Sequence, residues 1–467
     1  MVHQHCFDEC TFVIFGATGD LSKRKLIPAI YKLVQDRRLC KFTIIGISID
    51  QTDEKKIIEQ ATKFIVDPQA DILTTLVNSF HYYQMDFSNK KAYANLKNFL
   101  EKFEHEQKLP KNRLFYFATM PEHFIDITKG LVKHNIVQKK ETATKTTDPW
   151  SRVVYEKPFG HNLKSSQKIN RYLADVFNEN QIYRIDHFLG KELVGNIALA
   201  RFTNRIFEPL WNNNHIENVH IVLNEKIGVE GRGAYYDANG AIKDMVQSHV
   251  LQLLALTAME APDKLGAASI RNAKATVLKK VQIDKVIRGQ YEGYLKEKNV
   301  SPRSKTETFI AIKALIDNKR WRGVPFYLTT GKCMPIKESY IQVNFKKAEC
   351  LLSACPSESN YFRINIEPNE GFYLSLNAKV PGKANEVTPV TMELPHARLL
   401  GPNTPEAYEV LIADIMKGDQ SAFVRGDEVQ ISWKIVEQID KAHNAKLYSY
   451  PQGSTGPHEV KKIFSQK

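Results

Sequence analysis

The first 190 residues alternate between short apolar runs and stretches with helical spacing. The apolar runs predict strands at 11–15, 41–47, 113–118, 152–159 and 182–186. Apolar residues at helical spacing predict helices at 21–34 and near 54–66, 90–103 and 122–134. Continuous apolar strands that alternate with helices favour a parallel sheet covered by helices on both faces.

Beyond residue 215 the apolar positions form longer runs, several with period two. These runs predict strands at 218–225, 339–346, 361–368, 371–378 and 390–394. Helices are expected at 241–259, 405–417 and 428–442. Alternating strands with turn residues between them favour a large, mostly antiparallel sheet. The sequence therefore predicts an α/β domain at 1–190 and a β+α domain at 191–467.

Length and composition agree with two large domains, because 467 residues with 43% hydrophobic content are long for one domain. No apolar run approaches the roughly 20 residues that cross a bilayer. The start, MVHQHCFDEC, lacks the basic and apolar segments of a secretory signal. We therefore expect a cytoplasmic protein that does not bind membranes.

Cysteine content and charge narrow the environment and the partners. The six cysteines are too sparse for a disulfide framework, so we expect reduced thiols at Cys6, Cys10, Cys40, Cys333, Cys350 and Cys355. A net charge of +13 admits nucleic acid, an anionic surface or acidic small molecules as partners. Because the basic residues are interleaved with acidic ones, we favour a small-anion site over nucleic acid. Net charge alone does not distinguish between these partners.

The segment FGATGD places Gly16 and Gly19 between the first predicted strand and helix. Glycines at this point let backbone amides approach a pyrophosphate at a helix N-terminus. Ile14 occupies the first glycine position of the full G-x-G-x-x-G pattern, so an ordinary tight turn is the alternative. The second strand is followed by Ser48 and Asp50, where a side chain can contact an adenine ribose.

The segment EKPFG places Lys157 at the C-terminal end of a predicted strand, directly before Pro158. A lysine there can point into the crevice where α/β proteins bind ligands, whereas an isolated strand-end lysine is more often a surface residue. An X-Pro bond at the end of a sheet is a candidate for the cis form. We predict a cis Lys157–Pro158 peptide that fixes the direction of the lysine.

The segment RIDHFLGKE, at 184–192, concentrates charged side chains at the end of a strand-like run. Further along, Met245, His249 and Leu253 recur at i, i+4 and i+8, so His249 lies on or beside the apolar face of a helix. Such a histidine is either a hydrogen-bonded core residue or a general base, which needs a carboxylate partner. Spacing does not prove that Asp186 is that partner.

The N-terminal HQHCFDEC offers His3, His5, Cys6 and Cys10 as zinc ligands. Against this, no second Cys/His pair lies at matching spacing, and Cys10 directly precedes the first strand. We therefore predict no metal site.

Seven segments together resemble the glucose-6-phosphate dehydrogenase family, in the same order and over nearly the whole chain. They are GATGDLSKRKL, EKPFG, RIDHFLGKE, EGRGAYYD, the helix with QSH, GVPFYLTTGK and GSTGP. The combination of EKPFG with RIDHFLGKE is highly specific. The resemblance implies a Rossmann-like dinucleotide-binding domain and a β+α domain whose large sheet forms a homodimer or a dimer of dimers. It also implies oxidation of β-D-glucose 6-phosphate to 6-phospho-D-glucono-1,5-lactone with NADP, the first step of the oxidative pentose phosphate pathway.

Site residues follow from the resemblance by motif position. It implies that His249 removes the C1 hydroxyl proton while hydride leaves C1, and that Asp186 orients the imidazole. It implies substrate contacts, including the phosphate contacts of His187 and Lys191, at Lys25, Lys157, His187, Lys191, Glu225, Asp244, Lys332 and Lys337. It implies coenzyme contacts at Gly16, Thr18, Gly19, Leu21, Ser48 and Lys157.

Some positions depart from the family's pattern. Phe188 replaces a tyrosine, so one phosphate-directed hydroxyl is missing, at a cost of at most about 1.5–3 kcal/mol. Ser248 replaces an asparagine before the base. Ile49 replaces an arginine that binds the 2′-phosphate and Asp50 would repel that group, so we predict relaxed selectivity between NADP and NAD. A second, structural NADP site, which animal members of the family hold with basic residues of the large sheet, is not expected. Thr329, Glu338 and Gln342 occupy some of those positions, although Arg363 remains.

Other function classes remain as alternatives. A sensor could bind NAD(P) or a sugar phosphate on the same scaffold without turnover, but sensing needs neither Asp186 nor His249. Binding of a polyanion such as nucleic acid is suggested by net charge alone. A dehydrogenase for free glucose is disfavoured, because free glucose has no phosphate to bind the clustered cationic residues. These residues are His187, Lys191, Lys332 and Lys337.

Overall fold

The computed structural model describes residues 6–139, 149–347, 358–383, 386–396, 405–442 and 446–464. The chain divides into two compact units. The first comprises Met1–Gly190 and Pro405–Gly426, and the second comprises Lys191–Thr404 and Asp427–Lys467. The sequence predicts a single domain boundary at residue 190, but Pro405–Gly426 also belongs to the first unit. This segment returns because its helix α12 (Ala407–Lys417) packs Leu411, Ile415 and Met416 into the first unit's core.

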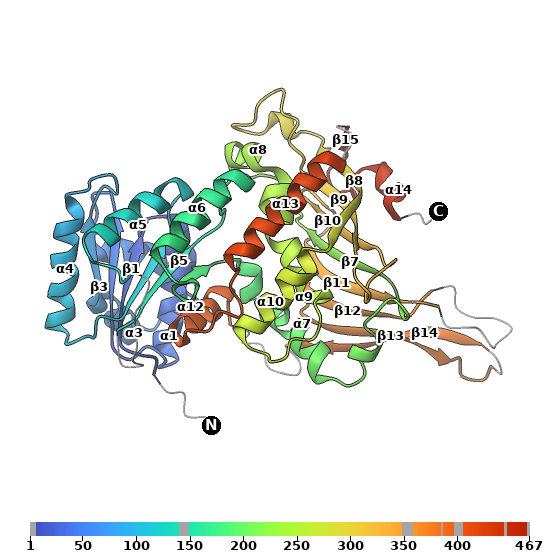
Figure 1. The fold of residues 1–467 in the computed structure, drawn as a ribbon, viewed down its shortest axis with the longest axis horizontal. Helices are drawn as coiled ribbons and strands as arrows, with labels where there is room; N and C mark the ends of the chain where they lie inside the picture. The colour runs from blue at the N-terminus through green and yellow to red at the C-terminus, as the bar shows by residue number, and fades with distance from the viewer. Residues whose placement is uncertain are drawn as a thin grey trace. The chain divides into compact units, whose positions relative to one another are not determined.

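A six-stranded, fully parallel sheet forms the centre of the first unit (Figure 1). Its order is β3-β2-β1-β4-β5-β6, with bounds β1 (Cys10–Phe15), β2 (Phe42–Ser48), β3 (Phe80–Gln84), β4 (Arg113–Phe117), β5 (Ser151–Tyr155) and β6 (Ile182–Arg184). Every residue of β1, β2 and β4 is buried, because helices cover both faces. The predicted parallel sheet is confirmed. The edge strand β3 was missed because FHYYQ contains no continuous apolar run.

Helices connect these strands. They are α1 (Ile27–Gln35), α2 (Glu54–Thr62), α3 (Ala70–Ser79), α4 (Ala92–Glu106), α5 (Phe124–Lys133) and α6 (Leu163–Val176), with a π-helical turn η1 (Ser22–Leu26) ahead of α1. Because all six strands run parallel, their C-terminal ends lie along one edge of the sheet. That edge therefore carries the residues that follow β1, β2, β5 and β6, where open α/β sheets bind ligands.

A nine-stranded sheet forms the second unit, in the order β14-β13-β12-β11-β7-β10-β9-β8-β15. The bounds are β7 (Ile216–Asn224), β8 (Val281–Tyr291), β9 (Phe309–Ile316), β10 (Phe326–Gly331), β11 (Glu338–Phe345), β12 (Tyr361–Glu367), β13 (Gly371–Lys379), β14 (Val387–Pro395) and β15 (Leu447–Tyr450). Neighbours are antiparallel except β7 with β10 and β8 with β15, so the mostly antiparallel sheet is confirmed. The sequence did not show β8, because charged residues interrupt its apolar positions.

The helices of the second unit are α7 (Glu192–Thr203), α8 (Gly233–Ala241), η6 (Ile242–Val250), α9 (Leu251–Ala258), α10 (Ala267–Leu278), α13 (Gly426–Ala442) and α14 (Lys461–Phe464). A single regular helix was expected at 241–259. Instead, Ala241 ends α8, Ile242–Val250 form the π-helix η6, and α9 continues from it. Among the described residues, no helix has both the length and the apolar character needed to cross a membrane.

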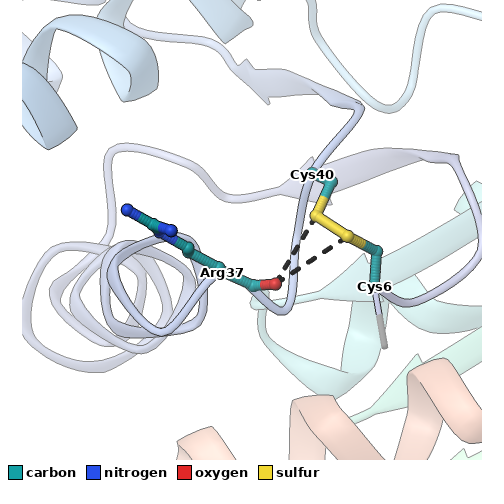
Figure 2. Close-up of a disulfide and its surroundings, with 3 residues drawn as sticks. All are labelled: Cys6, Arg37 and Cys40. Atoms are coloured by element: carbon teal, nitrogen blue, oxygen red, sulfur yellow. Dashed lines mark hydrogen bonds between the residues drawn. A yellow bond between two sulfur atoms is a disulfide. The ribbon is translucent and has the colours of Figure 1, made fainter. Parts of the chain in front are cut away.

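Two of the cysteines expected to be reduced are joined in a disulfide, Cys6–Cys40 (Figure 2). The expectation was wrong for this pair, because the N-terminal segment folds back on the loop between α1 and β2. There the Phe7 N–H donates to the Arg38 carbonyl at 2.8 Å. Cys10 and Cys333 are free thiols, while Cys350 and Cys355, like His3 and His5, lie outside the described residues.

Candidate active site

The turn after β1 is built tightly around Gly16. Its φ of +85° lies in the left-handed region, and a Cβ at this position would come within 2.4 Å of the Ala118 carbonyl oxygen. The Gly16 N–H donates to the Ile47 carbonyl at 2.8 Å, and the Gly19 N–H donates back to Gly16 at 2.9 Å. The chain then enters η1 after Leu21. Such a side-chain-free cradle at the start of a helix fits the pyrophosphate of a dinucleotide.

Four polar side chains meet at the C-terminal end of β2, namely Thr18, Ser48, Asp50 and Tyr82, whose hydroxyl lies 3.0 Å from that of Ser48. The Thr18 hydroxyl donates to the Ser48 hydroxyl at 2.8 Å and also contacts the Asp50 carboxylate. The Ser48 hydroxyl donates to the same carboxylate at 3.2 Å, while Ile49 points outward and is 63% exposed. A carboxylate at this place in an α/β domain is suited to accept hydrogen bonds from an adenine ribose.

The Lys157–Pro158 peptide is cis, as predicted. Directly before it, the Glu156 carboxyl group accepts hydrogen bonds from the hydroxyls of Tyr116 at 2.5 Å and Tyr408 at 3.3 Å. Burial raises the pKa of Glu156 to about 7. The sequence interpretation assigned Glu156 no role. Its only signal was a carboxylate adjacent to Lys157, and its tyrosine partners are distant in sequence.

The RIDHFLGKE segment continues from β6. Asp186 is 1% exposed, and its carboxylate accepts the backbone N–H of Phe188 at 3.0 Å. His187 begins the short 3₁₀ turn η4 (His187–Gly190) and is half-buried, with its ring centre 5.1 Å from that of Phe188. The segment thus holds a buried carboxylate at the sheet edge and turns the chain sharply immediately after it.

His249 lies on the π-helix η6 in the second unit and is 1% exposed. The chain enters this helix through a kink at Gly240, where φ is +64° and a Cβ would approach the Glu307 carboxylate to 2.4 Å. That carboxylate accepts the Ile242 N–H at 3.0 Å, which satisfies an unpaired donor at the start of the helix. Asp244, on the same helix, accepts a hydrogen bond from Tyr235 at 3.3 Å. π-Helical turns frequently occur at functional sites.

The predicted lysines of the second unit are held by carboxylates. Lys332 pairs with Glu225 at 2.6 Å, which brings together two residues expected to contact substrate. Lys191 and Lys337 both pair with Glu367, the last residue of β12. Sequence reasoning missed Glu367, because no local pattern links it to lysines so distant along the chain.

The predicted site residues divide between the two units. The first unit holds Gly16, Thr18, Gly19, Leu21, Lys25, Ser48, Lys157, Asp186 and His187, and the second holds Lys191, Glu225, Asp244, His249, Lys332 and Lys337. Lys25 lies in η1 and pairs with Glu406 at 3.0 Å on the surface of the first unit. The pairing of Asp186 with His249 would join the two units and stays a prediction.

Comparisons with known proteins agree over the full chain. The model of the glucose-6-phosphate dehydrogenase NAD binding domain matches residues 13–196, and that of the C-terminal domain matches residues 198–467. The chain is 42% identical over 483 residues to glucose-6-phosphate 1-dehydrogenase of Bacillus subtilis, covering 97% of this chain and 96% of the relative. It is 38% identical over 489 residues to the Chlamydia pneumoniae enzyme, with coverages of 98% and 94%. A solved structure of glucose-6-phosphate dehydrogenase in complex with its substrate glucose-6-phosphate is similar, with a TM-score of 0.90, 34% identity and coverages of 99% and 100%. The chain therefore belongs to the glucose-6-phosphate dehydrogenase family.

Proposed function

We propose that this protein oxidises β-D-glucose 6-phosphate to 6-phospho-D-glucono-1,5-lactone, with NADP as coenzyme and NAD as an alternative. The observation that carries the proposal is that this member of the family has two buried groups suited to proton transfer, His249 and Asp186. A sensor on the same scaffold needs no general base, so the enzyme is favoured over that alternative.

Each residue of the site has a separate role in the oxidation of C1. The nicotinamide ring, when bound, accepts the hydride that leaves C1 of the sugar. His249 accepts the proton of the C1 hydroxyl, and Asp186 holds the imidazole and stabilises the cation that forms. His187, Lys191 and Lys337 bind the phosphate dianion, for which ammonium groups are suited. Lys332 adds positive charge for the phosphate, and Lys25 and Lys157 supply positive charge at further substrate contacts. The acids Glu225 and Asp244 accept hydrogen bonds from sugar hydroxyls.

Coenzyme choice depends on the polar cluster at the end of β2. An ionised Asp50 accepts a hydrogen bond from a ribose hydroxyl but repels a 2′-phosphate, which favours NAD. Lys23 and Arg24 on the adjacent turn supply positive charge that favours NADP, although Arg24 pairs with Asp20 at 3.5 Å. We therefore expect kcat/KM for NADP to exceed that for NAD by less than about 100-fold, which corresponds to about 2.7 kcal/mol.

An absorbance assay at the nicotinamide band tests this function. Purified protein is mixed with glucose 6-phosphate or free glucose and with each coenzyme separately. We expect turnover of the phosphorylated sugar with both coenzymes and a much lower kcat/KM for glucose, because glucose leaves the lysines without an anion. If glucose 6-phosphate is turned over with neither NADP nor NAD, the proposed function is refuted. Equal kcat/KM for glucose 6-phosphate and glucose would refute the role of the lysines in phosphate binding.

We further propose a homodimer, or a dimer of dimers, formed through the large sheet. Apolar side chains on β13 and the edge strand β14 are exposed in the single chain: Leu376, Val390, Met392 and Leu394. Exposed apolar clusters of this kind mark protein–protein contacts. Sedimentation analysis of Met392→Asp beside the unchanged protein tests the surface, since we expect dissociation of the variant at micromolar concentration. An unchanged sedimentation profile would contradict it.

A cytoplasmic location is also proposed. A relative from Arabidopsis thaliana, 36% identical over 478 residues, carries the name glucose-6-phosphate 1-dehydrogenase 6, cytoplasmic. Cell fractionation tests the location, and recovery with a membrane or secreted fraction would contradict it.

A further inference from the structure

Glu367 bridges two of the lysines assigned to the substrate phosphate. One carboxylate oxygen contacts the Lys191 ammonium, and the other lies 3.1 Å from the Lys337 ammonium. The side chains are 25% exposed for Glu367, 15% for Lys191 and 64% for Lys337. All three residues belong to the second unit. A single carboxylate therefore pairs with both ammonium groups.

We propose that Glu367 is an internal competitor of the substrate phosphate, which must displace this carboxylate to bind Lys191 and Lys337. The inference rests on the proposed function, because it takes these lysines as the phosphate site. Carboxylates and phosphates are bound by the same charge-assisted hydrogen bonds from ammonium groups, so the two anions compete for the same donors. Glu367 would thereby set the affinity for phosphorylated sugars.

The carboxylate is charged at neutral pH. Burial on its own would raise the pKa of Glu367, but the hydrogen bond and charge of Lys191, together with the charge of Lys337, lower the pKa below its ordinary value. Glu370 and Glu192 contribute further negative charge near Lys191. A phosphate dianion that approached with Glu367 in place would meet a like charge, which is unfavourable.

Backbone hydrogen bonds, rather than the ion pairs, hold the segments that carry Lys191 and Glu367. Lys191 precedes α7, and its carbonyl accepts the N–H groups of Val194 at 3.0 Å and Gly195 at 3.2 Å. Glu367 ends β12, which is hydrogen-bonded to β11 on one side and β13 on the other. Removing the charge of Glu367 should therefore leave the backbones of Lys191 and Glu367 in place, while neither ammonium group pairs with the Glu367 charge any longer.

Glu367→Gln tests the competition, with Glu338→Gln as a matched control. Glu338 lies on the neighbouring strand and pairs with Arg363 at 3.7 Å instead of with Lys191 or Lys337. Both variants lose one negative charge. For each protein, KM and kcat for glucose 6-phosphate and the inhibition constant of inorganic phosphate are measured at saturating coenzyme. For Glu367→Gln we expect both KM and the inhibition constant to fall by about five- to tenfold, with kcat nearly unchanged and Glu338→Gln like the unchanged protein.

Each other outcome has a defined meaning. A higher KM in Glu367→Gln would show that the carboxylate positions the lysines for phosphate, and an unchanged KM and inhibition constant would show no competition. Equal changes in KM and in the inhibition constant for both variants would show that the loss of one negative charge acts over a distance, without direct competition for the lysines. Any of these results overturns the proposal while leaving the proposed function intact. Glu367→Ala, checked for folding by circular dichroism, repeats the test with a second side chain.

Failure of the proposed function itself is distinguishable. If the unchanged protein does not oxidise glucose 6-phosphate, binding of inorganic phosphate is measured directly by calorimetry. Tighter phosphate binding by Glu367→Gln than by Glu338→Gln would still support the competition, and equal binding would overturn it.

Discussion

Replacement of Glu156 by glutamine should change how the stability of the protein depends on pH. Burial raises the pKa of this carboxyl group to about 7, whereas its ordinary value is 4.5. Between these two values the folded state retains a proton that the unfolded chain has released. Stability from this group is therefore fully present below about pH 4.5 and is lost as the pH rises towards 7. Glutamine does not titrate, so the variant should lose this contribution to the pH dependence.

The magnitude follows from the two pKa values. The difference between about 7 and 4.5 is 2.5 pKa units, and each unit corresponds to about 1.36 kcal/mol, which gives about 3.4 kcal/mol at most. Glu156 as a whole residue is partly exposed, and solvent weakens such effects. Between about pH 5 and about pH 8 the unchanged protein loses this stability, whereas the variant does not. We therefore expect the difference in free energy of unfolding, variant minus unchanged protein, to be about 2 kcal/mol more positive at pH 8 than at pH 5.

Urea unfolding at these two pH values, followed by tryptophan fluorescence, measures the effect. Glu409 and Asp414 in α12 also have raised pKa values, about 7 and about 6, because of burial. They are present in both proteins and cancel in the comparison. Glu59→Gln, on the exposed face of α2, is the matched control and should show no pH-dependent difference. An equal difference between Glu156→Gln and the unchanged protein at both pH values would refute the argument.

Two further predictions concern a buried ion pair and the coenzyme. Lys274 and Glu428 pair at 3.0 Å with both side chains fully buried, so Lys274→Met should lower the free energy of unfolding by about 3–5 kcal/mol and a second change, Glu428→Leu, should restore most of it. Thermal unfolding measures this, and a double variant no more stable than Lys274→Met would contradict it. Asp50→Ser should raise the ratio of kcat/KM for NADP over NAD by about tenfold, because it removes one negative charge beside the 2′-phosphate. Steady-state kinetics measure that ratio, and an unchanged or lower value would contradict the role of Asp50.

The features predicted best from sequence are those whose residues are close together in the chain. The RIDHFLGKE and EKPFG segments follow strands directly, so parallel-strand geometry alone places Lys157 and Asp186 along one edge of a sheet. The glycine turn and the cis Lys157–Pro158 peptide were predictable for the same reason, because each depends on only a few consecutive residues.

Features that depend on tertiary contacts were not predictable. Glu367 and Lys191 are separated by 176 positions, and no local pattern connects them. The apolar face of 405–417 correctly indicated a helix, but an apolar face does not specify which core will bury it. The prediction of reduced thiols at Cys6 and Cys40 was wrong for a related reason. Cysteine content describes the whole chain and does not show which two cysteines the fold brings together.

The kinetics of His249→Asn test the central claim most directly. Asparagine retains polarity but cannot accept the C1 hydroxyl proton at neutral pH. We predict that kcat for glucose 6-phosphate falls by about 10²- to 10⁴-fold, while the substrate dissociation constant measured by calorimetry changes little. A kcat equal to that of the unchanged protein would contradict the assignment of His249 as the base.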